Sequence, residues 1–187
     1  MPIPRRSLTV GAAAAALTLG VARPILAQAV PAPSGQRAVV WNRVPTAQPV
    51  AFITIDDGYY TDLQAIAYVE AQRLPATLFL SVNAPAVFEQ PAYFRRYQAV
   101  GRNTIQSHGA PHDDMRGWSY EAQYTQLLHA ATEIERIYDA RPLAFRPPYG
   151  QYDDTTLQAA YDTGTRWLVR WSHALWNGAL RLSLIHI

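Results

Sequence analysis

The chain has 187 residues, 49% of them hydrophobic and 16% charged, which favours one globular domain and excludes a disordered chain. All 16 basic residues are arginines. Three of them lie among the first 29 residues, and the other 13 face 14 acidic residues, so the body lacks the cationic excess that nucleic-acid binding requires. Without cysteine, a disulfide framework and a thiolate nucleophile are excluded, and any metal must have histidine and carboxylate ligands.

The first 29 residues have the layout of an export signal. Two arginines precede an apolar stretch over residues 10–22, and Ala27-Gln28-Ala29 has the small residues of a cleavage site. The stretch is too short to span a bilayer, so no stable membrane insertion is expected. The arginine pair resembles a twin-arginine signal, with an ordinary secretory signal as the alternative. We therefore predict a secreted protein, with residues 30–48 as a linker or N-terminal extension and 49–187 as the domain.

The body alternates short apolar runs with longer patterns of helical period. The apolar runs predict five strands, over residues 50–55, 77–82, 103–107, 143–146 and 166–169. Helical spacing of apolar residues predicts four helices, over residues 61–73, 91–100, 119–140 and 154–162. Strands that alternate with helices pair in parallel, which predicts an α/β sheet or barrel. In such folds the functional site assembles at the carboxyl ends of the strands.

A pair of carboxylates follows the first predicted strand, in Asp56-Asp57-Gly58. Two adjacent carboxylates at a strand end cannot both face the core, and Gly58 permits a tight turn there. One of them can bind a metal while its neighbour takes a proton. Because aspartate and glycine are also common in ordinary turns, this run alone does not establish a site.

A pair of histidines follows the third predicted strand. His108 and His112 are four residues apart, a spacing at which two imidazoles can reach one metal ion. Pro111 argues against a regular helix between them and places the pair on a loop or a first turn. Neutral imidazoles suit Zn²⁺ and similar ions. The alternative is a pair of unrelated surface histidines.

A rigid turn follows the fourth predicted strand, in Arg146-Pro147-Pro148-Tyr149-Gly150. Arg146 would emerge from the strand into a site at its carboxyl end. Two prolines and a glycine impose a turn that can aim a backbone N–H in a defined direction. The alternative is an ordinary turn that carries a surface arginine.

The order and spacing of these motifs resemble the polysaccharide deacetylases that share the NodB homology domain, carbohydrate esterase family 4. That family has a Thr-Phe-Asp-Asp-Gly-like run, a His-x-x-x-His pair and an Arg-x-Pro-Tyr-Gly turn, and the resemblance covers residues 49–176. It implies an α/β fold, a distorted and incomplete (β/α) barrel. It also implies a hydrolase that removes N- or O-linked acetyl groups from peptidoglycan, a chitin-like polymer or xylan.

The resemblance implies a role for each matching residue. The metal ligands, which would bind Zn²⁺ or another divalent ion such as Co²⁺ or Ni²⁺, correspond to Asp57, His108 and His112. Asp56 corresponds to the general base, and Arg146 to the residue that orients this base. The backbone N–H of Tyr149 corresponds to the donor that stabilises the oxyanion. Pro148 and Trp171 correspond to residues that contact the substrate.

The match departs from the family at the general acid. The family takes this acid from a histidine in a late Leu-x-His run, which Leu184-Ile185-His186 resembles although it follows Trp171 by only 15 residues. We therefore assign His186, with His173 as the alternative, and expect a chain that is incomplete at its C-terminus. Gly109 stands where the family usually has serine or threonine, so the histidine loop lacks one hydroxyl.

Two other interpretations stay open. One is a non-catalytic glycan-binding protein or truncated pseudoenzyme, in which aromatic side chains stack on sugar rings. Its candidates are Tyr59, Tyr60, Trp118 and Trp171. The other is a hydrolase of small cyclic amides on the same fold, which the export signal disfavours. The leading expectation is a monomeric deacetylase whose partner is an acetylated polysaccharide, although an unclosed barrel would leave an unpaired strand edge that favours association.

Overall fold

The computed structural model describes residues 29–44, 46–47, 50–101, 105–177 and 180–185, and only the backbone of 173–177 and 180–185. Residues 1–28, which make up nearly all of the expected export signal, lie outside the described residues, and so does His186. Within the described part of the chain, no helix has both the length and the apolar character needed to cross a membrane.

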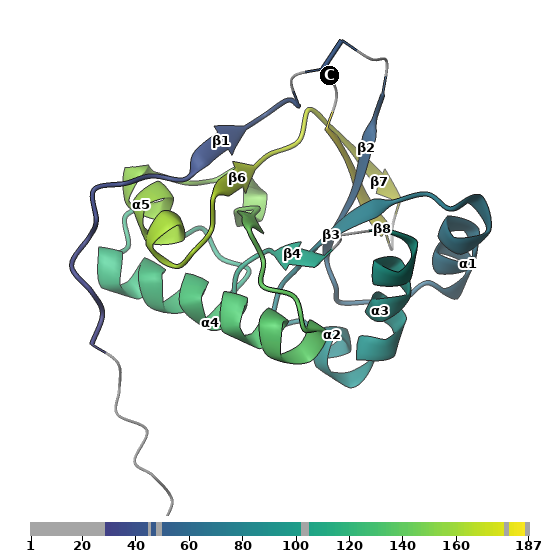
Figure 1. Cartoon of the computed structure of the whole chain (residues 1–187), viewed down its shortest axis with the longest axis horizontal. Helices are drawn as coiled ribbons and strands as arrows, with labels where there is room; N and C mark the ends of the chain where they lie inside the picture. The colour runs from purple at the N-terminus through teal and green to yellow at the C-terminus, as the bar shows by residue number, and fades with distance from the viewer. Residues whose placement is uncertain (1–28, 45, 48–49, 102–104, 178–179, 186–187) are drawn as a thin grey trace, which may run out of the picture.

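A single sheet forms the centre of the fold, with the strand order β1-β6-β5-β4-β3-β2-β8-β7. Its strands are β1 (Val39–Trp41), β2 (Phe52–Asp57), β3 (Ala76–Leu80), β4 (Ile105–Ser107), β5 (Ala144–Phe145), β6 (Trp167–Val169), β7 (His173–Asn177) and β8 (Leu180–Ile185). The strands from β1 to β2 in this order pair in parallel. β8 runs antiparallel to β2, and β7 runs antiparallel to β8. The sheet curls into a half-barrel with helices on its outside (Figure 1).

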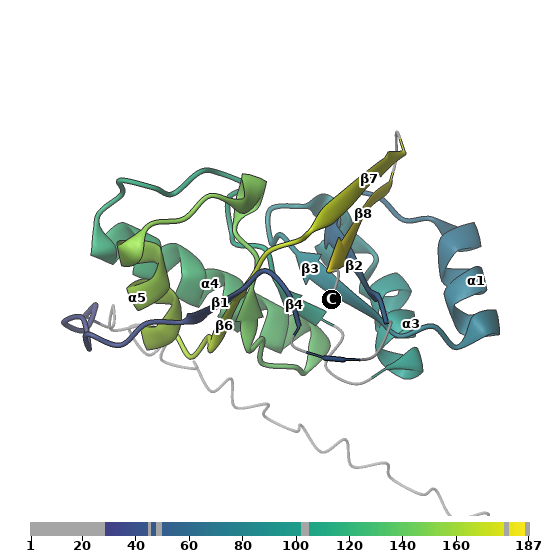
Figure 2. The ribbon, with the colours of Figure 1, turned by 90° about the horizontal axis from the view of Figure 1, so that it is seen from above.

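The helices are α1 (Leu63–Gln72), α2 (Pro85–Glu89), α3 (Pro91–Val100), α4 (Tyr120–Tyr138) and α5 (Asp154–Asp162), with a short 3₁₀ helix η1 (Pro148–Gly150). At the N-termini of three helices, side chains accept hydrogen bonds from backbone N–H groups that have no partner within the helix. Asp62 and Ser119 accept N–H bonds at α1 and α4, and Asp153 forms a reciprocal capping box with Thr156 at α5. Seen from above, α1 and α3 lie at one end of the sheet and α4 and α5 at the other (Figure 2).

The expected α/β half-barrel is confirmed, and each of the five expected strands and four expected helices has a counterpart within a few residues of its expected bounds. β1, α2 and the β7–β8 hairpin were not among the expected elements. β1 lies inside residues 30–48, which were expected to form a linker or extension. Here this segment is tied to α5, because Arg37 pairs with Asp154 at 3.0 Å and the Ala38 N–H donates to the Leu157 carbonyl. The hairpin adds an antiparallel edge to a sheet that was expected to be parallel.

The alternation of side chains along β2 separates the core from the site. Ile53 and Ile55 pack outward into the main hydrophobic core beneath the helices. Thr54 and Asp56 face the opposite way, and both accept hydrogen bonds from Arg146 on the inside of the half-barrel. The same strand therefore contributes both to the stability of the fold and to the polar site at its carboxyl end.

The inside of the half-barrel is apolar below this polar site. Phe79, Ala144 and Val169 form a buried cluster there. The rings of Trp41 and Trp167, 5.5 Å apart, lie beside a cavity of about 250 Å³ that reaches Phe79. The polar site thus lies next to a region with few polar groups, where charges interact more strongly than they do in water.

Gly58, directly after β2, occupies a position that suits only glycine. Its φ is +90°, and a Cβ would lie 2.8 Å from a methyl of Val87 and 3.0 Å from one of Leu80. Gly58→Ala is expected to lower the free energy of unfolding by about 2–5 kcal/mol, from backbone strain and overpacking together. At Gly117, also at positive φ, a Cβ meets nothing within 4 Å, so Gly117→Ala carries only the backbone cost of about 1–2 kcal/mol.

Urea denaturation of both variants measures this difference. Equal losses of stability in Gly58→Ala and Gly117→Ala would show that crowding against Val87 and Leu80 has no effect.

Candidate active site

The two carboxylates at the end of β2 point in different directions because a γ-turn is centred on Asp57. The Gly58 N–H donates to the Asp56 carbonyl at 3.1 Å, and Asp57 between them has a φ of +76°. Such a conformation is strained for a residue with a Cβ, and the Ser81 N–H anchors it by donating to the Asp57 carbonyl at 2.9 Å. As a result, Asp56 points to Arg146 and Asp57 points to the histidine loop.

Asp57, His108 and His112 form a cluster that is able to hold a metal ion. The Nε2 atoms of His108 and His112 lie 3.3 and 3.1 Å from the same Oδ1 of Asp57. One ligand atom from each residue lies within 4.8 Å of the other two. Asp57 and His108 are buried and His112 is half-buried. The structure therefore brings together the three side chains that were expected to be metal ligands.

The surroundings keep Asp57 ionised. Burial by itself would raise the pKa of this carboxyl group. When His108 and His112 carry a proton on Nε2 as well, their hydrogen bonds and positive charge outweigh the burial and hold the pKa of Asp57 well below its ordinary value. The cluster thus presents a carboxylate, which is the form that binds a cation.

The proton on His108 can be assigned from its outer partner. Nδ1 of His108 lies 2.7 Å from the carbonyl oxygen of Arg146, and a carbonyl can only accept. Nδ1 therefore carries the proton, and a neutral His108 directs the lone pair of Nε2 at the Asp57 carboxylate. A lone pair and a carboxylate 3.3 Å apart repel each other unless a proton or a cation lies between them. A divalent metal ion fits this donor set.

Two neighbouring hydroxyls support the histidine loop where Gly109 has none. The Gly109 N–H donates to the Ser107 hydroxyl at 3.2 Å, and the Ser81 hydroxyl lies 3.4 Å from the carbonyls of both Gly109 and Ala110. Gly109 itself has a φ of +91°, a conformation that a serine or threonine would adopt only with strain. The loop therefore takes its hydroxyl contacts from adjacent strand ends instead of from its own second residue.

Arg146 is fully buried and makes several contacts around Asp56. Its Nη1 donates to Asp56 Oδ1 at 2.6 Å and to Thr54 Oγ1 at 2.8 Å, while Nε donates to the Val169 carbonyl at 3.2 Å. The guanidinium lies 4.1 Å from the centre of the Phe79 ring. Burial lowers the pKa of Arg146, and the charge of Asp56 opposes that change. The Asp56 carboxylate is thereby held in one place by a cation that has several other contacts.

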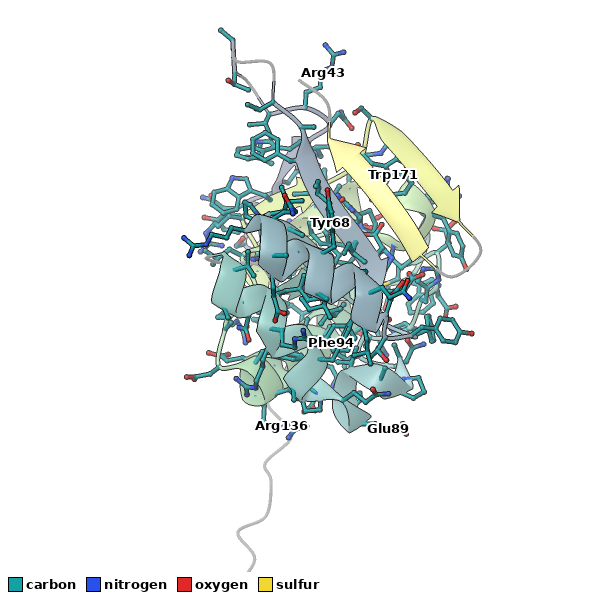
Figure 3. All side chains as sticks on the ribbon, turned by 90° about the vertical axis from the view of Figure 1, so that its right-hand side faces the viewer. Arg43, Tyr68, Glu89, Phe94, Arg136 and Trp171 are labelled. Carbon is teal, nitrogen blue, oxygen red and sulfur yellow. The ribbon has the colours of Figure 1, made fainter. Side chains whose placement is uncertain are left out.

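The Pro-Pro-Tyr-Gly turn completes the site on the side of β6. Tyr149 has a φ of +58° and is 60% exposed, whereas Pro148 is buried within η1. A Cβ on Gly150 would lie 3.2 Å from the ring of Trp171, which itself is 5.7 Å from the Arg146 guanidinium. Figure 3 shows Trp171 beside the β7–β8 hairpin. The turn therefore lies between the histidine loop and Trp171.

Most of the expected site residues converge at the carboxyl ends of the parallel strands, but not all can be placed. His186 lies outside the described residues, and only the backbone of His173 is described, in β7. Pro148 is buried, so its contact with substrate stays a prediction. Thr54 and Phe79, which contact Arg146, were not among the expected site residues. Thr54 alternates with Asp56 on one strand and was detectable from the period of two.

Comparison with known proteins assigns the family. Residues 43–168 match the polysaccharide deacetylase family, and the chain therefore belongs to it. The chain is 36% identical over 138 residues to an uncharacterized protein of Streptomyces coelicolor, covering 73% of this chain and 53% of that protein. It is 32% identical over 132 residues to a bifunctional xylanase/xylan deacetylase of Cellvibrio japonicus, covering 68% and 19%. The chain thus spans about half the length of the first of these relatives.

Solved structures show the same fold at low sequence identity. A deacetylase of Streptococcus pyogenes in complex with acetate, PplD, superposes with a TM-score of 0.57 at 22% identity, covering 67% of this chain and 57% of that one. A pseudoenzyme of carbohydrate esterase family 4 from Bacillus anthracis gives a TM-score of 0.55 at 19% identity, covering 75% and 45%. Because both an enzyme and a pseudoenzyme have this fold, activity must be argued from the site.

Proposed function

We propose that this protein is a metal-dependent hydrolase that removes N- or O-linked acetyl groups from a polysaccharide. One observation carries the proposal. The strand end that directs Asp57 at two imidazoles also directs Asp56 at a buried arginine, so a cation site and a separate carboxylate base lie side by side. This pairing is what hydrolysis of an unreactive amide or ester requires.

Asp57, His108 and His112 would hold Zn²⁺, or Co²⁺ or Ni²⁺ in its place. Three protein ligands leave a coordination position open, as in catalytic zinc sites. When bound, the metal would polarise the acyl carbonyl and lower the pKa of a water molecule. The three side chains supply two neutral nitrogens and one carboxylate, and the chain has no cysteine that would favour a closed structural site.

The remaining steps fall to other residues of the site. Asp56, held by Arg146, would take a proton from the attacking water. The Tyr149 backbone N–H would donate to the oxyanion that forms on the acyl carbon. We propose His186, or His173 in its place, as the acid that protonates the departing sugar amine or hydroxyl.

The substrate class follows from the family and from the surface around the site. Tyr149 and Tyr60 are 60% and 77% exposed, and aromatic rings of this kind can stack on sugar rings. One relative combines xylanase with xylan deacetylase activity, which supports acetylated xylan as one substrate. Chitin-like oligomers and peptidoglycan are the other two candidates. The proposed secretion by twin-arginine export would give the enzyme access to such polymers.

Acetate release tests the proposal. The protein is incubated with acetylated xylan, chitin oligomers and peptidoglycan, and free acetate is measured before and after treatment with a chelator. We expect release from at least one polymer, its loss on chelation, and its return when Zn²⁺ or Co²⁺ is restored.

Release that persists through complete removal of the metal would contradict metal dependence. Binding of Zn²⁺ and of a polymer without any acetate release would instead favour the non-catalytic glycan-binding interpretation.

A further inference from the structure

The same turn contacts both imidazoles of the metal cluster at Nδ1, the ring nitrogen that does not face Asp57. Nδ1 of His108 lies 2.7 Å from the Arg146 carbonyl, and Nδ1 of His112 lies 3.2 Å from the hydroxyl of Tyr149. In metal sites, the outer partner of a ligand histidine fixes its tautomer and its orientation. For His108 this partner is a backbone oxygen, whereas for His112 it is a side chain.

The phenol of Tyr149 has a second contact that fixes the direction of both hydrogen bonds. Its oxygen lies 3.4 Å from the carbonyl oxygen of His112, which can only accept. The single hydroxyl proton of Tyr149 is therefore directed at that carbonyl, and the phenol oxygen accepts from Nδ1–H of His112. His112 is then protonated on Nδ1 and has a lone pair on Nε2, which lies 3.1 Å from Asp57 Oδ1.

The backbone, more than burial, holds Tyr149 in this place. Tyr149 is 60% exposed, but its φ of +58° between a proline and a glycine turns its side chain back over the histidine loop. The Tyr149 and His112 rings meet edge to face, with centroids 4.8 Å apart and planes at 78°. A residue in a strained conformation at a site is a reasonable candidate for a functional role.

We propose that the Tyr149 hydroxyl is a positioning group that fixes the tautomer and orientation of His112 for metal binding. The inference rests on the proposed metal-dependent function, but it concerns a contact that can be tested without substrate. His108 keeps its backbone partner whatever side chain stands at position 149. Tyr149→Phe removes the partner of His112 alone and keeps the ring that packs against it.

Zinc affinity and histidine tautomers in Tyr149→Phe test this inference. Competition with a chromogenic chelator is expected to show Zn²⁺ affinity about 10–100-fold below that of the wild type. In the metal-free protein, imidazole ¹⁵N spectra are expected to show that His112 loses its Nδ1–H form while His108 keeps it. The matched control is Tyr68→Phe, which removes an exposed phenol from α1 and is expected to leave both measurements unchanged (Figure 3).

The outcomes separate this inference from the deacetylase proposal. Unchanged zinc affinity and an unchanged His112 tautomer in Tyr149→Phe would overturn the inference, as would a wild-type protein that binds no Zn²⁺. A wild-type protein that binds Zn²⁺ but releases no acetate would overturn the proposed enzyme activity. In that case a tautomer change in Tyr149→Phe would still support the positioning role.

Discussion

Asp56→Asn is expected to lower kcat for acetate release by about 10²–10⁴-fold, the range typical for loss of a positioned general base. Asparagine keeps the shape of the side chain and an oxygen for the Arg146 Nη1, but it cannot accept a proton from water. Zinc affinity should change little, because Asp56 points to Arg146 and not to the histidines. The expected result is thus a protein that binds metal normally and turns over slowly.

Stability must be measured alongside the rate in this variant. The Arg146 charge is fully buried, and removing its partner leaves it uncompensated, at a cost of about 3–5 kcal/mol. Rates are therefore taken well below the melting temperature of the variant. The control is Asp139→Asn, at an exposed position with a φ of +54° that asparagine adopts readily. A wild-type kcat in Asp56→Asn would show that Asp56 is not the general base.

His108→Ala is expected to abolish both acetate release and measurable zinc binding. His108 is 2% exposed, so solvent cannot easily replace its nitrogen beside Asp57. Loss of a ligand should lower the affinity for zinc by more than the 10–100-fold that is typical when a ligand loses its outer hydrogen-bond partner.

Isothermal titration with Zn²⁺ and an acetate assay check this result. His129→Ala, which removes an exposed imidazole from α4, is the matched control and should behave like the wild type. A His108→Ala variant that binds zinc as tightly as the wild type would show that the cluster of Asp57, His108 and His112 is not the metal site.

The sequence predicted the elements whose signals are local. Apolar runs and helical periods located the central strands and long helices. β1 was missed because its three residues carry little pattern and Val39 is 56% exposed at the sheet edge. The β7–β8 hairpin pairs locally and was missed because the tail was interpreted as an incomplete chain end, while the pairing of β8 with β2 joins segments more than 100 residues apart and has no local signal.

The candidate site likewise has some features with a local signal in the sequence and others without one. The motifs around Asp56, His108 and Arg146 could be recognised because spacing along the chain places them at strand ends. The γ-turn at Asp57 and the contact between Tyr149 and His112 depend on backbone angles and on the packing of separate loops. No periodicity in the sequence reports such angles, so these features required the structure.

The positive φ of Asp57 has a consequence for attempts to make this protein more heat-resistant. Glycine or asparagine adopts that backbone conformation with less strain than aspartate, so either substitution would lower the backbone strain of the turn. Neither supplies the negatively charged oxygen that lies against both imidazoles. Asp57 is therefore a residue at which substitution would relieve backbone strain but would remove a group that the proposed chemistry needs, a local conflict between stability and activity.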